Sequence, residues 1–227
     1  AQTCFNVNNL LAADPTPAVQ TAGALPEKPV KARIVEQLLT DSGISAGDAE
    51  EIYQQLMDYL DGDTTTAKEG LETDAWAGVE PARLPANQMM RTPGELKLLP
   101  AFPVAAYGKV SKVLCALPDT ASKVDVNTLT EEQAPLLAAL FIGSLSEDEA
   151  ARLIASRPEE GWEAMEAFQI ELETNYPQTK DALKQVQAFL AVNSHYFRVN
   201  STGNTDDLTL RVVSQLHVDN EAEKVIT

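Results

Sequence analysis

Two sequence patterns occur twice in this chain, in the same order, and this repetition constrains the fold more than any other feature. Residues 44–52 (ISAGDAEEI) match residues 145–153 (LSEDEAARL), with the serine, acidic, alanine and aliphatic positions in register. Upstream of these segments, FNVNNL at 5–10 matches VDVNTL at 124–129. The order of strand, loop, helix and capped helix is kept in both copies, so the sequence predicts an internal duplication. We therefore expect two similar small helical bundles packed in tandem.

The middle of the chain carries repeated start signals for helices. A Ser or Thr followed three residues later by an acidic residue or Gln can form a capping box, in which each side chain bonds the other residue's backbone N–H. Gly43 follows an apolar pattern of helical spacing, and we expect it to end the helix that begins near Ala32. The expected cap pairs are Ser45 with Asp48, Thr92 with Glu95, Thr130 with Gln133, and Ser146 with Glu149.

Both ends of the chain show strand patterns instead. The N-terminal run CFNVNNL reads as a strand, as do HYFRVNSTG, DLTLRVVSQLHV and AEKVIT near the C-terminus, with a turn expected near Gly203 and Asn204. The stretch GDTTTAKEGLETDAWAGVEP is rich in turn residues, and we expect no helix in it. This order predicts an α+β fold in which a small sheet is interrupted by a large helical insert.

The charge of the chain disfavours polyanionic partners. It has 34 Asp and Glu residues against 17 Lys and Arg residues, which gives a net charge of -17. Phosphates would be repelled over a Debye length of about 8 Å, so neither nucleic acid nor anionic lipid is an expected partner. A helix-hairpin-helix nucleic-acid-binding protein is the alternative function, because residues 95–110 have its helical frame. Pro103 and Val104, however, replace the glycines whose amides would face phosphate.

Motifs of known enzyme classes are missing from the sequence. It contains no GxSxG, no HExxH and no glycine-rich phosphate loop. His195 lies in a strand pattern that favours a structural role, and Trp76 and Trp162 are expected to be core anchors. We therefore expect no enzyme, although the many carboxylates leave open a hydrolase that uses paired acids.

The acidic stretch at residues 61–74 is the strongest candidate for a ligand site. It contains five acidic residues and, as its basic residue, Lys68. Calcium takes about six to eight oxygen ligands in a flexible cage, which carboxylates two residues apart in a turn can supply. The alternating Asp/Asn pattern of an EF-hand is absent, so residue types alone favour a solvated loop and leave a calcium site as the alternative. The acidic residues are Asp61, Asp63, Glu69, Glu72 and Asp74.

The cysteines, Cys4 and Cys115, lie in similar apolar runs, TCFNV and VLCAL. Their spacing matches no metal-binding or redox motif. The sequence leaves two alternatives open, a disulfide in an oxidising compartment or two buried free thiols. The histidines, His195 and His217, are too few for most zinc sites.

Several segments taken together resemble a known family. FNVNNL, the LDGD turn with its acidic loop, LPANQ, GELKLL, CALP, VDVNTLT and HYFRV occur in the order seen in minor pseudopilin K of the bacterial type II secretion system, the general secretion pathway protein K family. The resemblance implies a pilin-like sheet interrupted by two SAM-like helical subdomains. Residues 1–10 and 194–227 would then be the pilin-like strands, residues 11–120 the first subdomain with the acidic loop, and residues 121–193 the second.

The resemblance also implies a structural function. Proteins of this family lie at the tip of a short pseudopilus in a complex with minor pseudopilins I and J. This complex starts assembly of the pseudopilus, and the bulky helical head caps it. The major pseudopilin and secreted proteins are further expected contacts. A long hydrophobic helix anchors the family in the inner membrane, and this sequence lacks it, since its longest apolar run, residues 135–142, is far shorter than the roughly 20 residues a span needs. We therefore expect a soluble fragment at the periplasmic face of that membrane.

Structural calcium in the helical domain is a further implication of the resemblance. Because Thr73 occupies the slot of a family acid, Asp74 is the least well aligned of the candidate ligands, and Asn87 of LPANQ is an additional one. The periplasm also favours a disulfide between Cys4 and Cys115. The expected metal ligands are Asp61, Asp63, Glu72 and Asp74.

Overall fold

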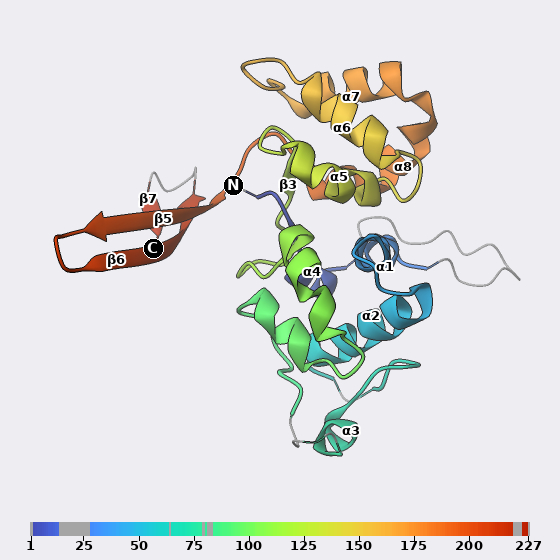
Figure 1. Ribbon diagram of the computed structural model, residues 1–227. Helices are drawn as coiled ribbons and strands as arrows, with labels where there is room; N and C mark the ends of the chain where they lie inside the picture. The colour runs from blue at the N-terminus through green and yellow to red at the C-terminus, as the bar shows by residue number, and fades with distance from the viewer. Residues whose placement is uncertain are drawn as a thin grey trace, which may run out of the picture.

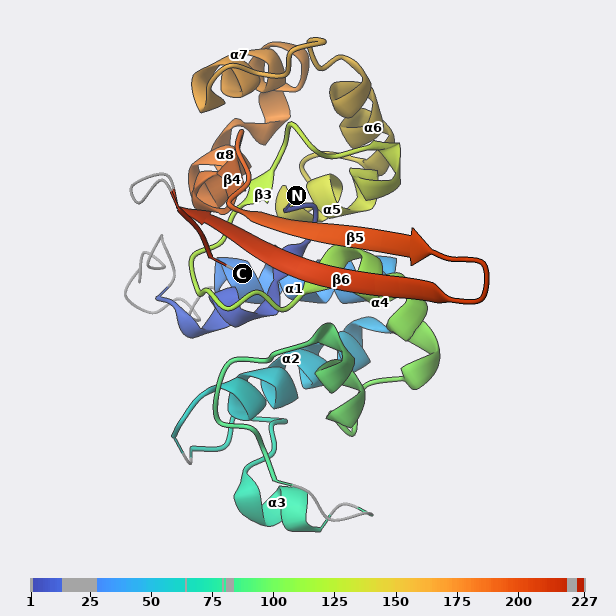
Figure 2. The same ribbon diagram turned by 90° about the vertical axis from the view of Figure 1, so that its left-hand side faces the viewer.

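The structure is a computed structural model of the chain, and it describes residues 2–13, 28–63, 65–78, 80, 84–219 and 224–226. Two groups of helices lie one above the other in Figure 1, with a long β-hairpin at their side. Figure 2, turned by 90°, shows the same hairpin extended in front of the helices. Within these residue ranges, no helix is both long enough and apolar enough to cross a membrane.

A pair of short parallel strands closes the first helical unit. Phe5 of β1 lies opposite Leu114 of β2, and Asn6 lies opposite Cys115. The helices that lie between these two strands in sequence pack their apolar sides against one another. The elements in order are β1 (Phe5–Asn6), the 3-10 helix η1 (Val7–Leu11), α1 (Val30–Asp41), α2 (Ala46–Leu60), α3 (Thr73–Ala77), η2 (Pro93–Leu98), η3 (Val104–Ala106), α4 (Tyr107–Val113) and β2 (Leu114–Cys115).

The second helical unit is closed in the same way. Its first strand pairs in parallel with its last, with Val124 opposite Leu190 and Asp125 opposite Ala191. The helical segment before that last strand ends at Phe189, because Leu190 and Ala191 form this strand pair. The elements are β3 (Val124–Asp125), η4 (Glu131–Gln133), α5 (Ala134–Leu140), α6 (Glu147–Ala155), α7 (Met165–Asn175), η5 (Pro177–Thr179), α8 (Lys180–Val186), η6 (Gln187–Phe189) and β4 (Leu190–Ala191).

The third part is an antiparallel sheet in the order β5-β6-β7, made of β5 (Tyr196–Asn204), β6 (Thr209–Asp219) and β7 (Lys224–Ile226). Asn204 pairs with Thr209, so the turn lies just after the predicted Gly203–Asn204 position. Successive side chains of a strand point to opposite faces. One face of the hairpin is accordingly apolar, and it is exposed at Phe197, Val199, Leu210 and Val212.

A continuous hydrophobic core joins the two helical units. α1 packs against α2 of its own unit and against α5 of the second. Ile34 and Leu38 of α1, Leu56 of α2 and Leu136 of α5 are all fully buried. Full burial of an aliphatic side chain contributes about 1.5–3 kcal/mol, so this shared core stabilises the tandem arrangement.

The helix caps agree with the sequence prediction. Ser45 accepts a hydrogen bond from the backbone N–H of Asp48, as expected for the start of α2. Gly43 has φ +94°, a left-handed conformation that favours glycine just beyond a helix end. Complete capping boxes form at Thr92 with Glu95, Thr130 with Gln133, and Ser146 with Glu149.

Two local predictions are wrong. The run CFNVNNL is extended only at β1, because the side chain of Asn6 accepts a hydrogen bond from Asn8 N at 3.2 Å and caps η1. The acidic, turn-rich stretch does contain a helix, the short α3. Its formation coincides with full burial of Trp76, so tertiary packing outweighs the weak local helix signal.

The N-terminal and C-terminal segments meet without sharing a sheet. The sequence predicts that residues 1–10 and residues 194–227 contribute strands to one sheet, whereas β1 pairs with β2, and the sheet near the C-terminus contains β5, β6 and β7. Contact between the segments comes from Gln2. Its backbone N–H donates to Ser194 Oγ at 3.1 Å, and its Oε1 accepts from His195 N at 2.6 Å.

Candidate functional site

The acidic stretch begins where α2 ends and folds back on itself. Asp61 caps the C-terminus of α2, and its backbone N–H donates to Met57 O at 2.9 Å. One carboxylate oxygen from each of Asp61, Asp63 and Glu72 lies within 4.8 Å of the other two. The structure therefore brings together three of the four expected metal ligands. The side chain of Asp74 lies outside the described part of the chain.

Asp58, in the last turn of α2, holds the returning loop. Its two carboxylate oxygens accept hydrogen bonds from Ala67 N at 3.2 and 3.1 Å. Gly70 passes so close that a Cβ at this position would lie 2.0 Å from Asp58 Oδ2. Asp58 is itself buried, so the carboxylate, the loop backbone and the glycine form one tight contact.

Trp76 fixes the far end of the loop. Its Nε1 donates to Leu71 O at 2.8 Å, and its ring packs against Tyr59 of α2 with the ring centroids 5.7 Å apart. Trp76 is 0% exposed and Trp162, in the second unit, is 4% exposed. The prediction that both tryptophans are core anchors is confirmed.

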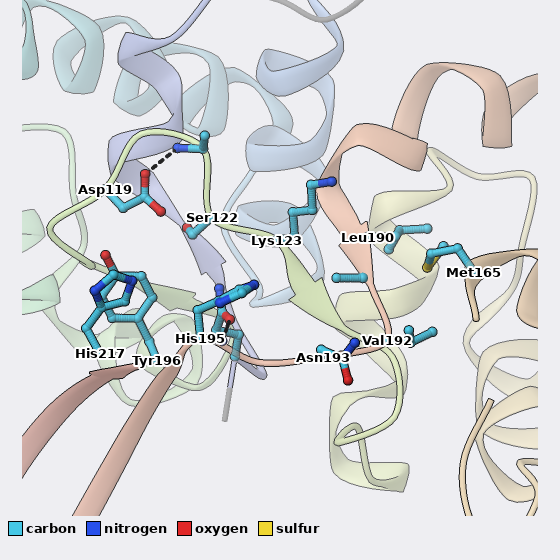
Figure 3. Close-up of a pocket in the computed structure, with 13 residues that line it drawn as sticks. Asp119, Ser122, Lys123, Met165, Leu190, Val192, Asn193, His195, Tyr196 and His217 are labelled. Atoms are coloured by element: carbon cyan, nitrogen blue, oxygen red, sulfur yellow. Dashed lines mark hydrogen bonds between the residues drawn. The ribbon is translucent and has the colours of Figure 1, made fainter. Parts of the chain in front are cut away.

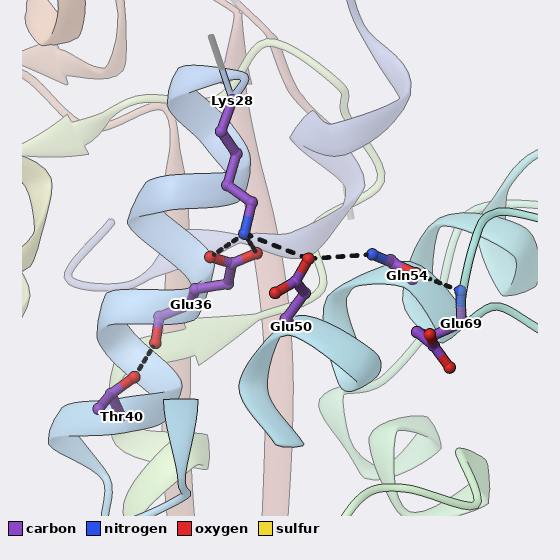
Figure 4. A network of polar contacts seen from close by, with 6 residues as sticks. All are labelled: Lys28, Glu36, Thr40, Glu50, Gln54 and Glu69. Atoms are coloured by element: carbon purple, nitrogen blue, oxygen red, sulfur yellow. Dashed lines mark hydrogen bonds and ion pairs between the residues drawn. The ribbon is translucent and has the colours of Figure 1, made fainter. Parts of the chain in front are cut away.

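A polar network ties the outer side of the loop to α1 and α2 (Figure 4). Lys28 Nζ lies 2.7 Å from Glu36 Oε1 and 3.8 Å from Glu50 Oε1. Gln54 donates to Glu50 at 3.5 Å and accepts a hydrogen bond from the backbone N–H of Glu69 in the loop. The loop is thus attached to α2 on both sides of its turn.

Two carboxyl groups beside this loop, those of Asp58 and Asp61, have raised pKa values. Burial is the main cause of the raised pKa of Asp61, and the charge of Asp63 adds to it. Burial also raises the pKa of Asp58, where the hydrogen bond from Ala67 opposes the shift and the charges of Asp61 and Asp63 reinforce it. A cation among these groups would reverse that balance, because a nearby opposite charge favours the ionised form.

The available ligands fit a hard divalent cation. Among the described residues, Asp61 Oδ1 is buried and has no hydrogen-bond partner. Glu72 is buried too, and a buried carboxylate is tolerated when it is paired or coordinates a metal ion. The group contains carboxylates alone, which suit calcium or magnesium, whereas zinc prefers His and Cys. Carboxylates from an irregular loop suit calcium better, since calcium accepts variable coordination geometry whereas magnesium demands a near-ideal octahedron.

Sequence reasoning missed Asp58 and left Asn87 open. Asp58 lies one helical turn before Asp61, so its position on the same side of α2 was a usable signal. Asn87 has φ +46°, and its backbone N–H donates to Tyr59 O at 3.0 Å. This contact brings the LPANQ segment to the C-terminal end of α2, the end from which the acidic loop starts.

The cysteines form a disulfide. Cys4 and Cys115 are bonded, with their Cα atoms 5.8 Å apart, beside the paired strands β1 and β2. Of the two alternatives that the residues left open, the structure has the disulfide. It joins the start of the first helical unit to its end.

Comparison with known proteins identifies relatives along the whole chain. Two family models, both described as type II secretion system (T2SS), protein K, match residues 3–119 and residues 124–193. Type II secretion system protein K of Pectobacterium carotovorum is 31% identical over 228 residues, covering 100% of this chain and 66% of that protein. The corresponding protein of Klebsiella pneumoniae is 34% identical over 170 residues, covering 74% of this chain and 49% of that protein. The chain spans 61% and 66% of the length of the first two curated relatives.

A solved structure shares the fold. The crystal structure of the GspK-GspI-GspJ complex from the enterotoxigenic Escherichia coli type 2 secretion system contains a chain that matches with a TM-score of 0.80 and 27% sequence identity. The match covers 100% of this chain and 74% of that chain. With the family models matched over both helical units, the chain belongs to the type II secretion system protein K family.

Proposed function

We propose that this chain is part of a structural tip subunit of the type II secretion pseudopilus, a minor pseudopilin that assembles with minor pseudopilins I and J. The observation that carries the proposal is the likeness of the entire chain to a solved chain from a GspK-GspI-GspJ complex. Assembly with I and J starts the pseudopilus, and protein export depends on it. The major pseudopilin and secreted proteins are further proposed contacts.

The shape of the molecule suggests how such a subunit would act. Two helical units form a head that is much bulkier than the hairpin beside it (Figure 1). In the proposed role the sheet is the pilin-like part and enters the assembly, while the head blocks the addition of another subunit above it. The exposed apolar face at Phe197, Val199, Leu210 and Val212 supports this role, because such a face is favourable only when something covers it.

We propose that the two helical units are SAM-like subdomains derived from one duplicated ancestor. Each begins with a short strand that pairs in parallel with the strand closing the same unit. In each unit the second repeated segment opens a helix, α2 or α6, with a Ser as N-cap. The family models divide at the same place, between residues 119 and 124.

We propose that Asp61, Asp63 and Glu72 hold a structural calcium ion, with Asp74 as a further ligand. The ion would supply a positive charge among the carboxylates and close the loop on α2. Other residues hold the loop in place: Asp58 binds the loop backbone at Ala67, and Trp76 anchors the end of the loop. The proposed location is the periplasmic face of the inner membrane, which the disulfide supports because disulfides persist in oxidising compartments.

The proposed role requires no bond chemistry. The alternative, a helix-hairpin-helix nucleic-acid-binding protein, is not favoured, because the net charge of -17 opposes phosphate and because Pro103 caps a 3-10 helix where a glycine hairpin would be needed. Retention of DNA in a gel shift at low salt, weakening steeply as salt is added, would revive that alternative.

A secretion assay tests the function. In a bacterium from which the gene for protein K has been deleted, the whole protein that contains this chain should restore export of type II substrates to the medium. A version lacking the hairpin, residues 196–219, should accumulate in the periplasm without restoring export. Full export in the deletion strain without any protein K, or with the hairpin-deleted version, would contradict the proposal.

A further inference from the structure

Three adjoining hollows form a groove between the hairpin and the helical units. The central hollow has a volume of about 590 Å³ and shares Gln2 and Tyr196 with a hollow of about 340 Å³ at one end. It shares Arg91 and Gln215 with a hollow of about 360 Å³ at the other end. We call the three together the hairpin groove. The shared residues make it one elongated depression rather than a single compact pocket.

The walls of the central hollow come from distant parts of the sequence. The hairpin contributes Arg198 and Gln215, which pair across β5 and β6 on the face opposite Val199. The first helical unit contributes Arg91 and Lys112 on the other side. Leu114, Ala116 and Val213 provide apolar surface in the same hollow. The groove therefore combines apolar surface with charged groups.

The charge of the groove is opposite to that of the chain. Arg91, Lys112 and Arg198 line the central hollow, and no Asp or Glu of the described residues does so. Across the chain, acidic residues outnumber basic ones by 34 to 17, so an acid-free hollow with three cations is a marked local reversal. Glu95, close to Arg91 in sequence, is held elsewhere, since it accepts hydrogen bonds from two backbone N–H groups and from Tyr59.

The end hollow near Tyr196 is also lined by charged groups (Figure 3). Lys123 lines it, and the histidines of the chain, His195 and His217, lie beside Tyr196. Asp119 is the acid in this hollow, and its Oδ1 accepts a hydrogen bond from the backbone N–H of Ala121 at 2.9 Å. Lys123 and Asp119 therefore offset one another, and the excess of positive charge is confined to the central hollow.

We propose that the hairpin groove binds an extended, acidic segment of a partner protein. Asp or Glu side chains of the segment would pair with Arg91, Lys112 and Arg198, and its backbone would lie along the apolar surface. Arginine suits this role, because its planar guanidinium binds a carboxylate through two parallel hydrogen bonds. The length of the groove favours a polypeptide over a small anion, which would need one hollow alone. Arg198 and Gln215 lie on the opposite face of the hairpin from Val199 and Val212, so the two faces can be used together.

Binding of a hexaglutamate peptide with blocked ends tests the proposal, with hexaglutamine as the uncharged control. The titration is followed by NMR at about 0.15 M salt, where a Debye length of about 8 Å limits the influence of acids elsewhere on the chain. We expect hexaglutamate to shift the backbone amide signals of Arg198, Gln215 and Lys112. Hexaglutamine should leave these signals unchanged.

Variants separate the groove from general electrostatic attraction. The double substitution Lys112→Gln and Arg198→Gln should weaken hexaglutamate binding roughly fivefold or more, since each exposed ion pair contributes modestly. Lys180→Gln with Lys184→Gln removes the same charge from α8, outside the groove, and should leave the affinity unchanged. An unchanged melting temperature shows that both variants are folded.

Several results would overturn the proposal. One is the absence of any shift with hexaglutamate. Equally weakened hexaglutamate binding in the two double variants would show that the cations of the groove are not responsible for binding. Equal binding of hexaglutamine would show that binding does not depend on the charge of the peptide. Inorganic phosphate that produces the same shifts at the same concentration would show an anion site instead of a peptide site.

Discussion

Asn8 and Asn127 occupy equivalent positions in the two helical units and make the same set of contacts. Asn8 Nδ2 donates to the backbone oxygens of Met90 and Leu117, and its Oδ1 accepts from Met90 N at 2.8 Å. Asn127 Nδ2 donates to the backbone oxygens of Trp162 and Val192, and its Oδ1 accepts from Trp162 N at 2.8 Å. Each asparagine therefore ties the start of its unit to two segments that are distant in sequence.

Replacing either asparagine by alanine should destabilise the protein. The substitution leaves backbone groups without partners, and we expect a loss of about 2–4 kcal/mol in the free energy of unfolding for Asn8→Ala. Asn127 is only partly buried, so water can replace some of its bonds and Asn127→Ala should cost less. Urea unfolding measures both. Asn200→Ala, at an exposed position of β5, is the control. If Asn200→Ala lost as much stability as Asn8→Ala, the stabilising role of the Asn8 contacts would be refuted.

Calcium should stabilise the first helical unit. Removal of calcium by a chelator should lower the melting temperature, and added calcium should restore it; at a concentration of 100 times the dissociation constant the gain is about 2.7 kcal/mol. Asp61→Asn with Asp63→Asn should abolish the effect, because two of the clustered carboxylates are lost. Glu69→Gln, in the same loop but outside the cluster, should retain it. A melting temperature insensitive to chelator would rule out the calcium site.

The contribution of Asp58 and Asp61 to the stability of the calcium-free protein should fall as pH rises above 3.8. The folded state raises the pKa of Asp58 and Asp61 above their ordinary 3.8, so it binds more protons there than the unfolded chain. The resulting contribution to stability is present below pH 3.8 and is lost as pH rises through the raised values. Comparing urea unfolding of the wild type with that of Asp58→Asn isolates this effect from other carboxylates. A wild-type protein that gains stability relative to the variant as pH rises over this range would contradict the predicted direction of the pH dependence.

Gly70 should be sensitive to the smallest side chain. An alanine Cβ there would lie 2.0 Å from Asp58 Oδ2, so Gly70→Ala should displace the loop and cost about 1–3 kcal/mol. Gly62→Ala, in the same loop, meets nothing within 4 Å and serves as the matched control. Thermal unfolding monitored by fluorescence reports on both, because Trp76 is fully buried at the loop end. Equal melting temperatures for the two variants would argue against the close contact.

Local signals in the sequence were sufficient for the helix starts. The boxes at Thr92 and Ser146 depend on residues three positions apart, so their chemistry is complete within one turn. The extent of β1 could not be foreseen in the same way. Its brevity depends on Asn6 and Asn8, whose side chains bond to Leu117 and Asp119, more than 100 positions away.

The candidate site was only partly predictable, because it too depends on contacts between residues that are separated in sequence. Asp61 and Asp63 are neighbours in sequence, but their approach to Glu72 needs the loop reversal that Asp58 and Gly70 create. Residue types alone favoured a solvated loop, and the family resemblance indicated the metal ligands. The hairpin groove could not be predicted from the sequence, because the walls of its central hollow come from residues 2–4, 91–93, 111–117, 196–198, 213 and 215.

The molar mass of a mixture of this protein with the periplasmic parts of pseudopilins I and J tests the central claim most directly. Light scattering during size-exclusion chromatography measures it without labels. We predict a single peak with the summed mass of one copy of each protein. Three separate peaks with the masses of the free proteins would contradict the assignment of this chain to the pseudopilus tip.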